Sequence, residues 1–374
     1  MKFDTISNTQ AQPFMITWDL GRRCNYDCTY CAPIHHDNFS PHASLDELIS
    51  SAKFIFDYIT LVAQYRKNKE FHISLTGGEP TNNPNFIKLA NYLKQQADQL
   101  KDTLTLRFDL TTNGTLGPKV TAAVADTFQS ATISYHAEAS PVLKQGVLDR
   151  IEELRHKIYV KVNVMFHAQH FDECIELCNK FKENGTNFIP RLIGENPGGE
   201  KTFGHRYTDD QLAWINNFWG VEEKPVSKIE KFLGKIIPIN AFGASVGRPC
   251  CGGRTMCVSN NTEQEEVKFL TYRKFKNWHC SVNWYFLHIE QQTDSVYHHQ
   301  TCQAKFDKTT GPIGKISEGY DIVANLKRNL ENNTMPIIVC PNTFCSCGMC
   351  TPKSSDKTKL LDAISTVVDT TVFG

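Results

Sequence analysis

The sequence predicts an α/β protein built around a parallel sheet with helices outside it. Two observations predict this fold class. Between residue 15 and about residue 193, six short apolar runs rich in β-branched residues alternate with helical patterns. Such alternation is typical of parallel sheets, because each helix carries the chain back to begin the next strand. Six β/α units are also fewer than the eight of a complete barrel, which needs about 250 residues.

The elements follow in a regular order. The six expected strands cover residues 15–20, 71–76, 104–111, 130–135, 159–166 and 187–193. Between the first two, residues 44–63 are amphipathic and open with a Ser-x-x-Glu capping box at Ser44 and Glu47. Residues 86–100 carry a second helical pattern. Functional side chains are expected where the strands end, since barrels of this kind place their chemistry there.

Composition narrows the class of protein. The chain has 374 residues, enough for about two domains, and its formal net charge is zero. This balance gives no support for binding nucleic acid or an anionic membrane, although a local basic groove for nucleic acid is not excluded. No 18-residue apolar run and no signal peptide are present, so a cytoplasmic location without a membrane partner is expected.

Three of the 14 cysteines lie within eight residues, directly after the first expected strand. Cys24, Cys28 and Cys31 have the spacing C-x3-C-x2-C. Four thiolates would close all four irons of a 4Fe–4S cluster, whereas three leave one iron open to chelate a small molecule. In a long chain without a signal peptide, such spacing favours metal ligation over disulfides, with zinc as the alternative to iron.

The run CNYDCTYC resembles the cluster loop of the radical S-adenosylmethionine (SAM) superfamily. A second family element, GGEP at Gly77–Pro80, follows the second expected strand, where a plain turn is the alternative. The resemblance implies a partial (β/α)6 TIM-like barrel, with the open iron bound to the amino and carboxylate groups of SAM. It also implies an external electron donor such as flavodoxin or ferredoxin.

The resemblance also assigns SAM contacts. Tyr30 would lie by the adenine, and the GGEP backbone (Gly77, Gly78) with Glu79 would hold the amino group. Asn113 would approach the ribose or carboxylate, or else form an Asn-Gly turn. Polar residues on later strands that would point toward SAM or substrate are Ser134, His136, Asn163 and Arg191. A structural role is the alternative for this last group, since buried polar side chains need partners. His35, His36, His298 and His299 are expected in exposed loops, with a ligand role as the alternative.

Nine cysteines lie between residues 250 and 350. Two of them flank an expected β-hairpin with its turn near residues 293–295, and a helix is expected over 320–332. This order resembles the SPASM-like twitch subdomain and implies a small cysteine-rich β-hairpin plus helix domain with an auxiliary 4Fe–4S cluster. The implied ligands are Cys280, Cys302, Cys347 and Cys350, with Cys340 or Cys345 as a substitute for one of them. A structural zinc and the two clusters of a full SPASM domain are the alternatives. No role is assigned to Cys250, Cys251 and Cys257.

The expected domains are a radical SAM core over residues 1–204, a connector over 205–249 and the auxiliary-cluster domain over 250–374. The connector contains an aromatic helical pattern, TDDQLAWINNFW, that would cover the barrel mouth.

The resemblance implies an enzyme that cleaves SAM reductively to a 5′-deoxyadenosyl radical, which abstracts a hydrogen atom from the substrate. A two-electron oxidation of a small molecule or nucleotide, aided by the auxiliary cluster, is the first expectation. An isomerase or a C–C or C–S bond-forming enzyme acting on a nucleotide, a nucleic-acid base or a peptide is the alternative. About fourteen residues precede the first strand, too few for a leader-peptide-binding domain, which disfavours a peptide. A non-catalytic iron–sulfur scaffold or regulator is the alternative of another class.

Overall fold

The computed structural model describes most of the chain. The described residues are 3–8, 12–31, 36–193, 207–218, 256–259, 264–267, 274–300, 302, 304, 307, 310–342 and 351–373. Within this part of the chain, no helix is long and apolar enough to span a membrane.

A nine-stranded sheet forms the centre of the fold. Six of its strands are parallel neighbours and confirm the six predicted strands: β2 (Phe14–Asp19), β3 (Glu70–Thr76), β4 (Thr105–Thr112), β5 (Ser130–His136), β6 (Tyr159–Phe166) and β7 (Asn187–Leu192). They follow one another in space in the order of the sequence. The carboxyl ends of all six therefore lie along one edge, where the loops that follow them can meet.

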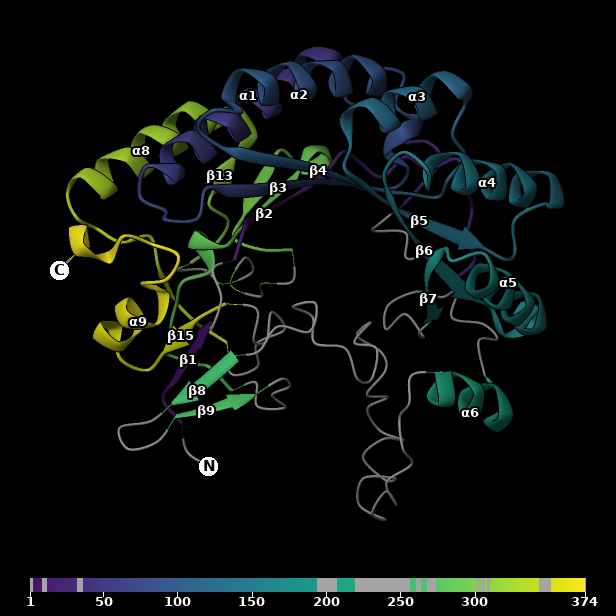
Figure 1. Cartoon of the computed structure of the whole chain (residues 1–374). Coiled ribbons are helices and arrows are strands. Elements are labelled where there is room, and N and C mark those ends of the chain that lie inside the picture. The colour runs from purple at the N-terminus through teal and green to yellow at the C-terminus, as the bar shows by residue number, and fades with distance from the viewer. Residues whose placement is uncertain are drawn as a thin grey trace.

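Helices connect these strands and cover the convex face of the sheet (Figure 1). They are α1 (Leu45–Ala63), α2 (Phe86–Leu100), α3 (Pro118–Thr127), α4 (Pro141–Leu154) and α5 (Phe171–Glu183). The predicted capping box at the start of α1 is confirmed: the Ser44 hydroxyl accepts from Glu47 N, and Ser44 N donates to the Glu47 carboxylate at 2.7 Å. The class is thus an α/β fold consistent with a partial barrel.

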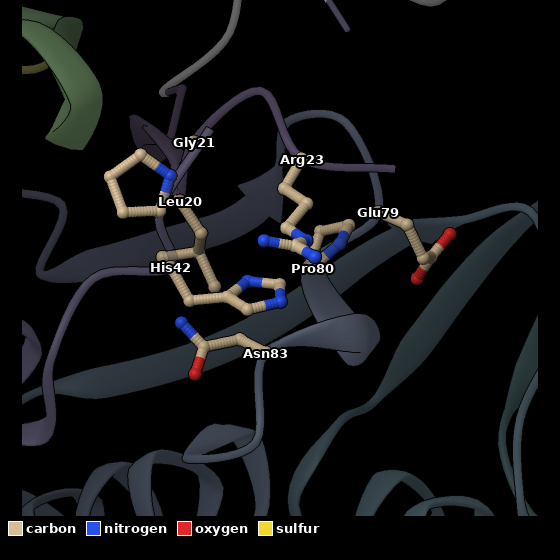
Figure 2. A pocket seen from close by; sticks show the side chains of 8 residues that line it. Leu20, Gly21, Arg23, His42, Glu79, Pro80 and Asn83 are labelled. Atoms are coloured by element: carbon tan, nitrogen blue, oxygen red, sulfur yellow. The ribbon is translucent and has the colours of Figure 1, made fainter. Parts of the chain in front are cut away.

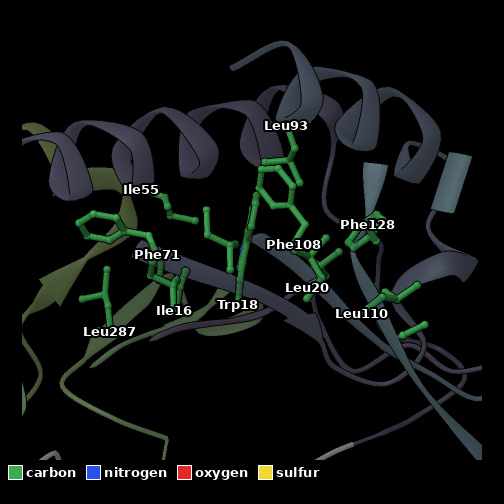
Figure 3. Close-up of a cluster of buried hydrophobic side chains, with 14 of the residues drawn as sticks. Ile16, Trp18, Leu20, Ile55, Phe71, Leu93, Phe108, Leu110, Phe128 and Leu287 are labelled. Atoms are coloured by element: carbon green, nitrogen blue, oxygen red, sulfur yellow. The ribbon is translucent and has the colours of Figure 1, made fainter. Parts of the chain in front are cut away.

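The main core lies between the sheet and these helices. In β3, Phe71, Ile73 and Leu75 are fully buried, while the residues that alternate with them are half-buried on the opposite, concave face. Figure 3 shows the same layer, with Trp18 between the sheet and the helix side chains. The alternation fixes which side chains point toward the helices and which remain on the concave face.

The predicted hairpin is present, but it extends the central sheet. Strand β11 (Phe286–Glu290) pairs in parallel with β2, and β12 (Ser295–Tyr297) and β13 (Gly314–Lys315) follow outward. Its turn contains Asp294 with φ 51°, a left-handed conformation that aspartate tolerates. Three consecutive residues of β11 are buried, so both faces of this strand are covered. The cysteine-rich segment therefore shares a sheet with the first half of the chain.

A second, smaller sheet is antiparallel and has the order β14-β10-β15-β1-β8-β9. Its strands are β1 (Thr5–Asn8), β8 (Met256–Ser259), β9 (Gln264–Val267), β10 (His279–Cys280), β14 (Ile338–Val339) and β15 (Lys353–Ser354). Helix α9 (Lys357–Ile364) lies beside it (Figure 1). The sheet thus joins the N-terminal strand to segments of the C-terminal third.

Two further helices complete the described fold. Helix α8 (Gly319–Glu331) confirms the helix predicted over 320–332 and packs against α1 (Figure 1). Helix α6 (Asp209–Phe218) confirms the aromatic pattern as a helix. Its Trp214 ring stacks on Phe166 at 5.3 Å between centroids, so α6 is anchored on the α5 side of β6. The 3-10 helices are η1 (Pro80–Asn82), η2 (Ala168–His170), η3 (Val282–Trp284), η4 (Gln291–Thr293), η6 (Ile316–Glu318) and η7 (Thr370–Phe373).

The expectation of exposed side chains was wrong for two histidines. His36 is 8% exposed and His298 is 6% exposed, although both were expected in exposed loops. His298 Nδ1 is hydrogen-bonded to Asn283 Oδ1 at 2.6 Å, and burial lowers the pKa of His298 to about 4. The loops fold back onto the protein, which local polarity in the sequence does not reveal.

Candidate functional site

The cysteine loop leaves the carboxyl end of β2. Cys24 and Cys28 are buried and Cys31 is half-buried. Cys24 N donates to Asp37 O at 2.7 Å, and Asp37 N donates to Arg22 O at 3.0 Å, so a backbone bridge to Asp37 closes the base of the loop. Cys31 N donates to Cys28 O at 3.2 Å, which makes a tight turn between the last two cysteines.

The GGEP motif lies directly against this loop. Gly78 N donates to Gly21 O at 2.8 Å, and Glu79 N donates to Arg23 O at 2.9 Å. A Cβ on Gly77 would lie 2.5 Å from Gly21 O, with φ at +136°, and a Cβ on Gly78 would lie 2.1 Å from Arg22 O. Only glycine permits such a close approach of two backbones. The two motifs recognised in the sequence are therefore one structural unit.

Glu79 lies in the protein interior with its carboxylate surrounded by donors. Oε1 accepts from Thr81 N, Thr81 Oγ1 and Thr112 Oγ1 at 2.6–3.1 Å, and Oε2 accepts from Asn113 N at 2.6 Å. Burial raises the pKa of Glu79, while these four hydrogen bonds act in the opposite direction. The carboxylate thus joins the loop after β3 to the end of β4. Its predicted contact with the SAM amino group stays a prediction.

A cavity beside the motif is too small for a nucleoside. It is lined by Leu20, Gly21, Arg23, Pro41, His42, Glu79, Pro80 and Asn83 (Figure 2) and has room for about one water molecule. In Figure 2 the Glu79 carboxylate points away from His42 and Arg23. Burial, followed by the charge of Arg23, lowers the pKa of His42. This cavity therefore adds no space for SAM.

Glu79→Gln tests both roles of the carboxylate. The glutamine amide keeps the size of the side chain, but it places an N–H₂ group against one of the N–H or O–H groups that donate to the carboxylate. We expect a lower melting temperature, and SAM binding weaker by about 1.5–3 kcal/mol if the ammonium contact exists. Differential scanning fluorimetry and equilibrium SAM binding measure the two effects. Thr81→Val, which removes one donor and keeps the carboxylate, is the control and should retain SAM affinity. An unchanged SAM dissociation constant in Glu79→Gln rules out the ammonium contact.

Asn113 connects the end of β4 with the cysteine loop. Its Oδ1 accepts from Thr115 N at 3.0 Å and from Thr115 Oγ1 at 2.5 Å, which forms an Asx turn before Gly114. Its Nδ2 donates to Asn25 Oδ1 at 2.8 Å and lies 3.8 Å from Cys24 Sγ. The Asn-Gly turn foreseen as an alternative is present, and the amide is engaged by protein atoms.

His136, at the end of β5, faces the second cysteine. Its Nδ1 lies 3.3 Å from Cys28 Sγ and is also hydrogen-bonded to the Tyr30 hydroxyl. The ring stacks on Tyr30 at 5.9 Å and meets Tyr26 edge to face at 5.4 Å. Burial, with a smaller effect from His36, lowers the pKa of His136 to about 4. The imidazole is thus enclosed between Tyr26, Tyr30 and Cys28.

Glu138 is a site residue that sequence reasoning missed. Its carboxylate accepts from Thr29 N and Thr29 Oγ1, both at 2.9 Å, and lies 3.8 Å from His167 Nε2. It stands two residues after His136, just beyond β5, and that position is the signal that could have found it. Glu138 holds the far end of the cysteine loop to β5.

Three other predicted residues lie on the concave face of the sheet. Ser134 on β5 is the register partner of Asn163 on β6. Arg191 on β7 donates through Nε to Asn163 Oδ1 at 3.5 Å. All three are half-buried side chains on the face opposite the helices. The structure thus groups them on one surface, and their contacts with SAM or substrate stay predictions.

The three thiols fit an iron–sulfur cluster by their chemistry. Burial is the largest cause that raises the pKa of Cys24, Cys28 and Cys31, the last to about 11. The charge of Glu138, followed by the charges of Cys31 and Cys24, raises the pKa of Cys28 further. Iron binds thiolates and would release their protons. Within the described residues, no three His, Cys, Asp or Glu side chains converge as a ready metal site, so the loop supplies the donors without their final arrangement.

The auxiliary-cluster ligands are only partly described. Cys280 and Cys302 lie in one buried cluster with Val282, Ala304 and Ile338. Cys280 Sγ is 3.5 Å from Thr351 Oγ1, in the residue that follows Cys350. Cys347 and Cys350 lie outside the described residues, as do Cys250, Cys251 and Cys345.

The remaining cysteines are placed as follows. Cys340 Sγ donates to Asn342 O at 3.7 Å, and Cys257 is described through its backbone in β8. Cys174 and Cys178 are buried in the main core, on the inner face of α5.

The fold and these contacts define a class: an α/β protein with a cysteine loop and a glycine-rich acidic motif joined at the carboxyl ends of neighbouring parallel strands. Residues 18–203, about half of the chain, match the family model of the Radical SAM superfamily. This segment belongs to the radical SAM superfamily.

Other comparisons give fold-level likeness alone. No curated protein matches the chain. Native anSMEcpe with bound AdoMet is 15% identical and covers 83% of this chain and 80% of its own, with a TM-score of 0.46. With bound AdoMet and Cp18Cys peptide, native anSMEcpe covers 86% of this chain and 84% of its own at 15% identity and a TM-score of 0.49. BtrN in complex with AdoMet and 2-DOIA is 14% identical and covers 59% of this chain and 97% of its own, with a TM-score of 0.30.

Proposed function

We propose that this protein is a radical SAM enzyme that cleaves SAM reductively to methionine and a 5′-deoxyadenosyl radical, removes a hydrogen atom from a substrate, and so begins a two-electron oxidation. The observation that carries the proposal is the direct backbone pairing of GGEP with the cysteine loop, through Gly78 N to Gly21 O and Glu79 N to Arg23 O. A zinc site or a plain turn would not require both motifs to be joined in this way.

Residues of the chain have distinct tasks in this proposal. Cys24, Cys28 and Cys31 hold three irons as thiolates, and the buried surroundings of Cys24 and Cys28 keep water from the sulfurs. The cofactor supplies the radical chemistry when bound, and the protein supplies position. The polar concave face that carries Ser134, Asn163 and Arg191 supports a polar substrate, such as a small molecule or nucleotide, beside it.

An auxiliary 4Fe–4S cluster completes the proposal. Cys280 and Cys302 would hold it together with Cys347 and Cys350, and their place in one buried cluster supports the pairing of the first two. Strand β11 follows Cys280 closely and pairs with β2, whose end begins the cysteine loop. The pairing joins the segment after Cys280 to the strand that leads into the cysteine loop, and in the proposal the auxiliary cluster accepts the second electron of the oxidation.

Anaerobic reconstitution tests the proposed function. The full chain, loaded with iron and sulfide and given SAM and dithionite, should form 5′-deoxyadenosine and methionine in equal amounts, measured by liquid chromatography. Fully loaded protein that releases no 5′-deoxyadenosine would favour the non-catalytic scaffold and contradict the proposal.

A further inference from the structure

Two of the three loop sulfurs face side-chain nitrogen atoms that come from neighbouring strands. Asn113 Nδ2, after β4, lies 3.8 Å from Cys24 Sγ, and His136 Nδ1, at the end of β5, lies 3.3 Å from Cys28 Sγ. These nitrogens belong to residues that the family resemblance would assign to SAM. In the structure, their side chains contact the cysteine sulfurs instead.

The orientation of the Asn113 amide is determined by its neighbours. Thr115 donates to Oδ1 from both its backbone nitrogen and its hydroxyl, so Oδ1 is the acceptor end. The Nδ2 end therefore points toward Asn25 Oδ1 and Cys24 Sγ and can only donate to them. The opposite orientation would place the amide nitrogen against the backbone N–H of Thr115, which can only donate.

The backbone that carries this amide is held just as firmly. Asn113 N donates to Glu79 Oε2, and the neighbouring Thr112 hydroxyl donates to Glu79 Oε1 at 2.8 Å. Glu79 in turn belongs to the motif that pairs with the base of the cysteine loop. A donor fixed at both ends does not need to reorganise when the charge of its acceptor changes.

His136 is held in place by rings. Tyr30 stacks on one side of the imidazole and Tyr26 meets it edge to face. A ligating thiolate only accepts hydrogen bonds, and an imidazole that carries a proton on Nδ1 is a matching donor for Cys28. The Tyr30 hydroxyl shares Nδ1 and is also hydrogen-bonded to Cys28, so its oxygen can accept from Nδ1 while its proton points toward the sulfur.

We propose that Asn113 and His136 are positioning residues that donate hydrogen bonds to the sulfurs of Cys24 and Cys28 and thereby raise the reduction potential of the cluster held there. This inference rests on the proposed function. On reduction, one electron passes from a low-potential donor to the cluster, the donor loses that electron, and no bond forms or breaks. Hydrogen bonds to the sulfurs stabilise the more negative, reduced form, so the potential rises.

The test compares Asn113→Ala and His136→Phe with the unaltered protein. Phenylalanine keeps the ring between Tyr26 and Tyr30 and removes the donor. A redox titration followed by electron paramagnetic resonance gives the midpoint potential, and the signal that changes when SAM is added identifies the N-terminal cluster. Thr132→Val, on the same face of β5 but four residues before His136, is the control.

We expect each variant to keep its iron and its SAM affinity and to shift the midpoint potential to more negative values, while Thr132→Val leaves the potential unchanged. Full iron with an unchanged potential in both variants would overturn the inference, and so would iron loss in both, which would show a purely structural role. A fall in SAM affinity without a shift in potential would return both residues to SAM binding. Since the two residues come from different strands, iron loss in one variant does not affect the test in the other variant. The midpoint potential of that other variant then supports or overturns the inference. An unaltered protein without a SAM-responsive signal would contradict the proposed function itself.

Discussion

Replacement of Cys24, Cys28 and Cys31 together by alanine should abolish SAM cleavage. Three thiolates on one loop are the proposed ligands of the cluster that donates the electron, and no neighbouring side chain of the described residues forms a substitute metal site. We expect 5′-deoxyadenosine to fall below detection, while about four irons per chain remain in the auxiliary cluster. Iron analysis and product chromatography on the reconstituted protein measure both values.

A matched control separates this effect from a general loss of thiols. Cys174 and Cys178 are also buried, but they lie in α5 within the apolar core. Their double replacement by alanine should retain iron content and SAM cleavage, although it creates a small cavity that lowers stability. Continued cleavage of SAM by the triple variant would refute the assignment of the loop cysteines.

The parallel sheet could be predicted from the sequence because its signals are local. In β3, Phe71, Ile73 and Leu75 alternate with polar residues, and the pattern alone places one set against the helices. The capping box at Ser44 and Glu47 is likewise contained within four residues. Such features need no knowledge of distant segments, and the structure confirms them.

The pairing of distant segments could not be predicted in the same way. Strand β11 is parallel to β2, which precedes it by about 270 residues, and nothing in either strand specifies the other. Strand β1 is four residues long and lies in a polar N-terminal stretch. Its pairing with β8 and β15 comes from tertiary packing, which overrides weak local preference.

In the candidate site, too, local motifs could be predicted from the sequence, whereas contacts between distant segments could not. The motifs gave the cysteines and GGEP, because fixed spacings carry that information. The motifs did not predict which groups are hydrogen-bonded to one another. Asn113 is hydrogen-bonded to Thr115 and Asn25, and Glu138 accepts from Thr29, which precedes it by more than a hundred residues. Partner choice depends on how the strand ends converge, which only the assembled sheet defines.

Double replacement of Cys280 and Cys302 by alanine should lower the iron content from about eight to about four per chain, since each cubane holds four irons. Both cysteines lie in one small buried cluster, so the loss of both removes half of the proposed ligand set. SAM cleavage should persist, because Cys24, Cys28 and Cys31 lie on a different loop. If the auxiliary cluster accepts the second electron, the variant should cleave SAM but form no oxidised product.

Metal identity decides between the auxiliary cluster and its alternatives. Zinc has no redox role, so a structural zinc site would give stoichiometric zinc in the Cys24/Cys28/Cys31 variant and no paramagnetic signal on reduction. A cubane would give about four irons and such a signal in the same variant. About twelve irons in the unaltered protein would show three clusters and require further ligands, for which Cys250, Cys251 and Cys257 are available in the sequence. Cys340→Ala is the matched comparison, because the thiol of Cys340 donates to Asn342 O. Iron loss in that variant equal to the loss in the Cys280/Cys302 variant would assign Cys340 to the ligand set.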